Sequence, residues 1–223
     1  EKFAKLLFDY AVFLYSNKQY HLIGTLYDES LSIYRKLAEK NPETYDCCVA
    51  LTLNNLAGLH YITQRLDLAE KEYTEALDIR RRLAEKNSVA YKSSIDFLSD
   101  LIFNDLWGYS PPKEEKTYEE YESYVADTLN NLAGLHSDTQ RLDLAEKEYT
   151  EALDIRRRLA EKNPEAYESD VASTLNNLAC LHSHTQCLDS AEKEYTEALD
   201  IHRRLAEKNP EAYESDLANT LNN

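Results

Sequence analysis

The sequence predicts an all-α protein in which antiparallel helix pairs stack into a solenoid. Two strings recur in register: TLNNLA starts at Thr52, Thr128 and Thr174, and AEKEYTEALDI starts at Ala69, Ala145 and Ala191. The last two copies of each string are 46 residues apart. A fixed period of this size is typical of stacked repeats, in which each unit buries its apolar face against its neighbours. With only 4 Gly and 5 Pro among 223 residues, the chain also favours long helices over hairpins.

The unit at residues 121–166 shows how each repeat forms two helices. From Val125 to about Thr139 the apolar spacing predicts a first helix, with a stripe formed by Leu129, Leu132, Ala133 and His136. The short polar segment 140–142 then breaks the chain. The second helix places Ala145, Tyr149, Ala152, Ile155 and Leu159 on one face.

The ends of the second helix also have sequence signals. Asp143, followed by Glu146 three residues later, predicts an N-terminal cap. We expect the helix to run to about Lys162 and to stop at Asn163-Pro164, because a residue that precedes proline disfavours helix.

These motifs resemble the tetratricopeptide repeat family over nearly the whole chain. The small residue of the family's first helix matches Ala57, Ala133 and Ala179, and its second-helix triplet matches Ala145-Tyr149-Ala152 and the equivalent residues of the other copies. The resemblance implies a right-handed α-solenoid that binds other proteins. The period of 46 is longer than the usual 34 and is similar to that of kinesin light chain repeats. His60, His136 and His182 stand at the usual tyrosine position, where we expect them to serve in packing.

The 46-residue interval divides the chain into units of one solenoid domain. We expect a diverged first repeat at 1–44, repeats at 45–90, 121–166 and 167–212, and the start of a further, truncated repeat at 213–223. Residues 91–120 are 16 residues short and contain the break WGYSPP, so we interpret them as a degenerate repeat. The sequence has no Met, which suggests a piece of a longer protein.

Composition argues against several function classes. The chain has 41 Asp+Glu against 25 Lys+Arg, and this acidic balance predicts that it has no nucleic-acid partner. It has no apolar run long enough to span a membrane, so we expect no membrane partner. The basic strings 80–82 and 156–158 are interpreted as a solvated face, on which Arg81 pairs with Glu85 and Arg157 with Glu161. We expect no catalytic residues, no metal and no cofactor. The four cysteines suit reduced thiols and a cytoplasmic location.

The resemblance also implies where a partner would bind, since first helices line the concave groove in this family. The residues predicted for this role, named here the first-helix surface, are Leu51, Asn54, Asn55, Tyr61, Ile62, Asp127, Asn130, Asn131, Asp138, Ser173, Asn176, Asn177 and His184. Paired carboxamides suit an extended peptide backbone, because they offer both donors and acceptors. The repeated asparagines would equally suit an internal ladder between helices.

Differences between near-identical units give a second indication. The units that begin at Tyr121 and Tyr167 differ at seven positions, of which three (127/173, 134/180 and 138/184) are predicted to face the groove. This pattern suggests a constant scaffold with a varied groove, although drift at exposed positions would also produce it. Because Leu51, Tyr61 and Ile62 are apolar and Asp127 and Asp138 are acidic, we expect an extended partner segment that is part apolar and part basic. The alternative function is self-assembly, a homo-oligomer formed through the repeat ends, where Leu217 and Leu221 would be left uncovered.

Overall fold

The computed structural model describes residues 1–16, 20–88 and 117–222, and every regular element in these ranges is a helix. The all-α prediction is therefore confirmed. The helices are α1 (Lys2–Ser16), α2 (Tyr20–Ala38), α3 (Pro42–Ile62), α4 (Leu66–Lys86), α7 (Tyr118–Asp138), α8 (Leu142–Lys162), α9 (Pro164–His184), α10 (Leu188–Lys208) and α11 (Pro210–Asn222). The predicted degenerate repeat lies outside the described residues, except for residues 117–120.

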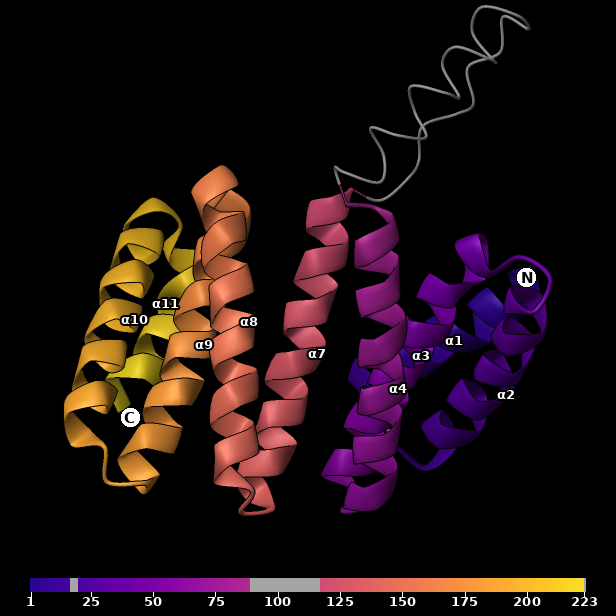
Figure 1. The fold of residues 1–223 in the computed structure, drawn as a ribbon, viewed down its shortest axis with the longest axis horizontal. Helices are drawn as coiled ribbons and strands as arrows, with labels where there is room; N and C mark the ends of the chain where they lie inside the picture. Colours follow the sequence, from indigo (N-terminus) through magenta and orange to yellow (C-terminus); the bar gives the residue numbers. More distant parts are fainter. Residues whose placement is uncertain (17–19, 89–116, 223) are drawn as a thin grey trace, which may run out of the picture. The chain divides into compact units, whose positions relative to one another are not determined.

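The chain forms two compact units, Glu1–Val125 and Ala126–Asn223. In the first unit, α1 packs against α2, α2 against α3 and α3 against α4 (Figure 1). In the second unit, the same serial packing joins α8 to α9, α9 to α10 and α10 to α11. Serial packing of this kind is the arrangement that defines a solenoid.

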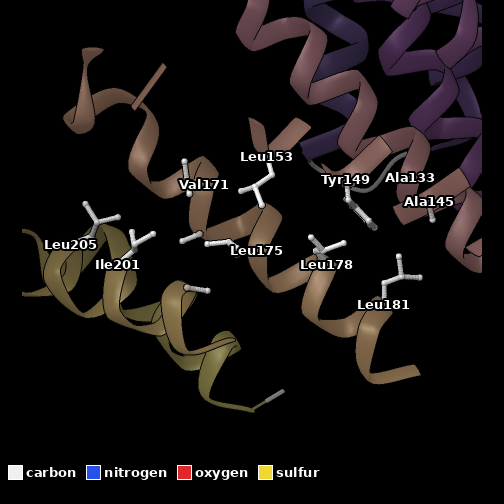
Figure 2. Packing of buried hydrophobic residues seen from close by; sticks show 12 residues of the cluster. Ala133, Ala145, Tyr149, Leu153, Val171, Leu175, Leu178, Leu181, Ile201 and Leu205 are labelled. Carbon is white, nitrogen blue, oxygen red and sulfur yellow. The ribbon is translucent and has the colours of Figure 1, made fainter. Parts of the chain in front are cut away.

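The core of the second unit consists of the repeated apolar stripes (Figure 2). Leu175, Leu178 and Leu181 of α9 point into a buried cluster that also contains Ile201 and Leu205 of α10. Fully buried alanines line the contacts, among them Ala133, Ala145, Ala172 and Ala198. Because alanine has a single methyl group, neighbouring helices can approach closely at these positions.

The junction between repeats is shorter than the sequence suggested. Asn163 ends α8 and also caps α9, accepting a hydrogen bond on its side-chain oxygen from the amide of Ala166 at 3.3 Å. Pro164 is the first residue of α9, a position that lacks an intrahelical N–H partner and so tolerates proline. The proline therefore starts the next helix as well as stopping the last one. In the preceding repeat, α7 begins at Tyr118, seven residues before the predicted start at Val125.

The turn within each repeat corrects the predicted cap at Asp143. Gln140 has a φ of 60°, and the amides of Gln140 and Arg141 donate to the carbonyls of Ser137 and His136. These two bonds form a Schellman motif, in which the left-handed residue usually is glycine. The turn places Arg141 at the N-cap without a side-chain hydrogen bond, and Asp143 follows in the first turn of α8. There its carboxylate interacts favourably with the positive end of the helix dipole, and it does not serve as the N-cap.

Candidate binding surface and the contacts around it

The recurring histidines have a partner that the sequence analysis missed. Nδ1 of His136 on α7 lies 2.7 Å from a carboxylate oxygen of Glu148 on α8. The pairs His60–Glu72 and His182–Glu194 have the same distance. Each pair, called here a His–Glu clasp, joins the two helices of one repeat. The histidines therefore connect the helices by a polar contact as well as by packing. The constant spacing of twelve residues between His and Glu in all three copies was the available signal.

Burial changes the protonation of the clasp in the first unit. Desolvation raises the pKa of Glu72 to about 7 and, together with the charge of Arg65, lowers the pKa of His60. Both shifts disfavour the charged form, as expected when two ionisable groups leave water.

Two arginines from the basic strings are buried, which contradicts the interpretation of these strings as a solvated face. Arg156 of α8 is only 6% exposed and donates to the carbonyl of Asp170 and to the hydroxyl of Thr174, both on α9. Its second terminal nitrogen lies 2.7 Å from a carboxylate oxygen of Asp127 on α7. Arg156 thus links three successive helices, and its burial is possible because hydrogen bonds and a carboxylate surround the cation.

Arg80 occupies the equivalent position in the first unit. It is also buried, donates to the carbonyl of Tyr124 at 2.7 Å, and lies 5.4 Å from the centre of that ring. A cation over an aromatic face is attracted by the ring quadrupole. The burial of Arg80 could not be predicted from the sequence, because a run of three arginines on a helix does not indicate which one faces the neighbouring helix.

The exposed arginine of the string also has a different partner from the predicted one. Arg157 lies 2.7 Å from Glu197 of α10 and contacts both of its carboxylate oxygens, in place of the predicted Glu161. Arg35 makes the same two-oxygen contact with Glu75. These pairs connect consecutive second helices, α2 with α4 and α8 with α10.

Several of the seven differences between the two similar units lie at contacts between helices. Asp127 and Arg156 form an ion pair, and the equivalent residues one unit later are Ser173 and His202, so both partners change together. At position 134/180, a Cβ added to Gly134 would lie 3.5 Å from the hydroxyl of Tyr149. One unit later, Cys180 occupies the position of Gly134, and its sulfur accepts a hydrogen bond from the hydroxyl of Tyr195 at 3.1 Å. These differences therefore have an explanation in packing that does not require a ligand.

The structure places the first-helix surface on α3, α7 and α9. On α3, Leu51 and Ile62 are 39% and 43% exposed, while Asn54, Asn55 and Tyr61 are half-buried. On α7 and α9, Asp138, Ser173 and His184 are exposed, and the remaining members, Asp127, Asn130, Asn131, Asn176 and Asn177, are half-buried. The first group lies in the first unit and the second group in the second unit.

The asparagines form part of a ladder. The amide of Asn177 on α9 donates to the side-chain oxygen of Asn130 on α7 at 3.1 Å. In the first unit, Asn55 shares a hydrogen bond with the hydroxyl of Tyr27, whose pKa burial raises to about 12. The bond between Asn177 and Asn130 uses one N–H and one lone pair, whereas a carboxamide can make about four hydrogen bonds.

Hollows are present in both units. A cavity of about 50 Å³ lies between Leu51, Arg80 and Tyr124 in the first unit. In the second unit, an open hollow of about 1070 Å³ follows the outer face of α10 and is lined by charged residues that include Glu192, Glu197 and Arg203. Within the described residues, no group of three or more His, Cys, Asp and Glu side chains is arranged to hold a metal ion.

Serially packed helix pairs with a recurring alanine contact define this chain as a helical-repeat protein. It belongs to the tetratricopeptide repeat family, whose model matches residues 49–90, 125–165 and 171–211. The assignment made from the repeated strings is confirmed. Members of this class serve as protein-interaction scaffolds, and the repeats support that role here.

Two solved structures show the same fold. BtubC (BKLC) from P. vanneervenii is 20% identical with a TM-score of 0.64, and the match covers 91% of this chain and 64% of that one. The apo form of RapI is 15% identical with a TM-score of 0.64, and the match covers 93% of this chain and 58% of that one. The chain thus spans less than two thirds of either relative. A comparison with curated proteins gives no match. No helix in the described ranges is long and apolar enough to span a membrane.

Proposed function

We propose that this chain is a non-catalytic, cytoplasmic scaffold that binds an extended partner segment along its first-helix surface. The observation that supports it best is on α3. Leu51, Asn55 and Ile62 fall on one side of this helix, and two of the three are apolar yet exposed. Exposed apolar side chains beside carboxamides can bind apolar side chains and the backbone of the same peptide.

The ladder between Asn130 and Asn177 is compatible with this role. A hydrogen bond between neighbouring helices fixes the direction of both carboxamides, which lowers the entropy lost on binding. The remaining donors and acceptors of the two side chains are then oriented for a backbone. The asparagines would serve both roles that the sequence left open.

The charge of the surface favours a partner that is part apolar and part basic. Asp138 of α7 is exposed, and the chain as a whole has a net charge of −16. Asp127 contributes less, because Arg156 neutralises part of its charge. The apolar contribution comes from Leu51 and Ile62.

A displayed-peptide selection tests this function. The parent and the variant Leu51→Ser/Ile62→Ser are compared with a matched control, Leu68→Ser, which changes a similarly exposed leucine on the second helix α4. We expect enriched peptides that bind the parent and the control but lose at least tenfold in affinity for the variant. Asn55→Ala, on the same helix as Leu51 and Ile62, should weaken the same peptides. Selection of acidic C-terminal peptides, or equal loss in the control, would contradict the proposal.

Self-association is a second candidate, supported by one observation on α1. Phe3, Leu6 and Phe13 are 56–64% exposed. Val49, Thr52 and Leu59 occupy the same repeat positions on α3 and are at most 4% exposed. An uncovered face of this kind suits a second copy of the chain. Light scattering should then give a mass that rises with concentration, and Phe3→Glu/Phe13→Glu should remove that rise; a constant monomer mass would exclude this candidate.

A further inference from the structure

The contact between α10 and α11 contains a histidine where the contact between α8 and α9 contains Arg156. His202 is 2% exposed, and its Nδ1 lies 2.9 Å from the hydroxyl of Thr220 on α11. That hydroxyl lies 3.1 Å from the carbonyl of Asp216. Thr174 in the earlier contact is placed in the same way, between Arg156 and the carbonyl of Asp170. The two contacts therefore share one hydrogen-bond relay and differ in its first member.

The relay fixes the protonation of the imidazole. The hydroxyl of Thr220 has one hydrogen, which it donates to the carbonyl of Asp216, so it must accept from His202. Nδ1 consequently holds the hydrogen of the neutral ring, and Nε2 has a lone pair. Nε2 is buried and has no hydrogen-bond partner. A second proton would therefore be placed on a buried atom that has no hydrogen-bond acceptor beside it.

The counter-charge that stabilises Arg156 is missing from this contact. Asp127 supplies a carboxylate to Arg156, but the equivalent residue for His202 is Ser173, which carries no charge. A buried cation without a paired anion is costly, because the charge has left water without compensation. The contact is thus built for a neutral side chain, unlike the contact one unit earlier.

We propose that His202 makes the contact between α10 and α11 sensitive to acid, so that α11 leaves α10 when the imidazole takes up a second proton. This inference is independent of the proposed peptide binding. Tyr213 of α11 packs against the core cluster that includes Ile201 and Leu205, so release of α11 would expose an apolar part of α10. Acidic conditions would therefore uncover apolar surface on α10.

The effect of burial on His202 outweighs that of the charged groups around it. Asp216 on α11 raises the pKa of His202, but burial has the larger effect and lowers it below its ordinary value. Arg203 and Arg204 of α10 are near Asp200 at 3.9 Å and Glu168 at 3.5 Å, respectively. Release of α11 exposes the imidazole of His202 to water, where its pKa returns to the ordinary value of about 6.5. The contact between α10 and α11 is therefore at full strength above about pH 6.5 and weakens as the pH falls below that value.

Hydrogen exchange of the α11 amides, corrected for intrinsic rates, measures this opening directly. Between pH 7.5 and 5.5 we expect protection of α11 to fall by up to about tenfold, the limit set by an ordinary imidazole pKa. The amides of α9, which has the same string and contacts Arg156, serve as the internal control and should change less than twofold. Unchanged protection of α11 in the parent would overturn the proposal.

Two variants separate the proposed role from general acid destabilisation. His202→Arg/Ser173→Asp installs the residues of the earlier contact and should remove the fall in α11 protection. His202→Gln cannot titrate but keeps a donor for Thr220, and it should also give protection that is independent of pH in this range. Retention of the full pH response in either folded variant would overturn the assignment to His202.

Discussion

The contact between α8 and α9 and the contact between α10 and α11 use the same string of residues, yet they are held in different ways. In the first contact, a permanent cation lies between Thr174 and Asp127. In the second, a neutral imidazole lies beside Thr220, and Ser173 replaces the aspartate. The loss of the cation and the loss of its anion go together. Near-identical repeats can therefore differ at buried contacts without leaving an uncompensated charge.

The largest expected difference between the two contacts concerns their leucines. Leu175 of α9 is 1% exposed, whereas Leu221 at the same repeat position of α11 is 59% exposed. Leu175→Ala should lower the free energy of unfolding by about 3 kcal/mol, through lost burial and a cavity. Leu221→Ala should change it by less than about 0.5 kcal/mol. Urea denaturation followed by circular dichroism measures both, and equal effects would mean that α11 is covered in solution.

The ion pair in the first contact gives the next largest effect. Asp127→Asn leaves Arg156 buried without its anion and should cost about 2 kcal/mol, less than for a fully buried pair because Asp127 is partly exposed. Ser173→Ala, the matched change in the second contact, should be nearly neutral. The same denaturation experiment compares them. A loss for Ser173→Ala as large as that for Asp127→Asn would contradict the assignment of the anion.

The exposed pair between second helices should contribute less. Glu197→Gln removes the carboxylate that contacts Arg157, and both side chains are about half exposed. We expect a loss of about 0.5 kcal/mol at low salt that disappears at 1 M salt, because solvent and ions screen such pairs. Asp200→Asn near Arg203, at 3.9 Å, should have no measurable effect. A loss for Glu197→Gln that is independent of salt would show that its origin is packing.

An effect of similar size but opposite sign should be the same in both repeats. Gln140 and Gln186 have φ values of 60° and 63°, a region that glycine adopts without steric cost. Gln140→Gly and Gln186→Gly should each stabilise by about 0.5 kcal/mol, since relief of strain exceeds the added entropy of the unfolded chain. Thermal unfolding of both variants is the test. Opposite signs in the two turns would mean that the turns differ, although their backbones match.

The sequence was sufficient for the fold because the same apolar spacing repeats in register, so that one correctly interpreted unit predicts the others. The end of α8 at Lys162 followed from the proline after Asn163. The early start of α7 did not follow, since residues 118–124 have charged side chains between their tyrosines and lack a clear stripe. Their helix is supported by packing of Tyr121 and Val125, which only the folded unit shows.

The contacts around the candidate surface could not be predicted from the sequence of a single helix. Arg156, Arg157 and Arg158 are consecutive, and which of them is buried depends on the rotation of α8 relative to α9. Likewise, Asp127 was assigned to a groove because its helix position is polar, whereas its partner is 29 residues away in the chain. Pairing between repeats is a property of the stack, and a single helix does not reveal it.

The one-residue junction at Asn163 restricts how such a protein can change in length during evolution. Adding or deleting one residue there would change the length of the junction and shift Thr174 relative to Arg156. Duplication or loss of a whole unit preserves the helix phase, because every copy brings its own capped junction. Gain and loss of entire 46-residue blocks is therefore the route of variation that the architecture tolerates, and near-identical neighbouring units are its natural product.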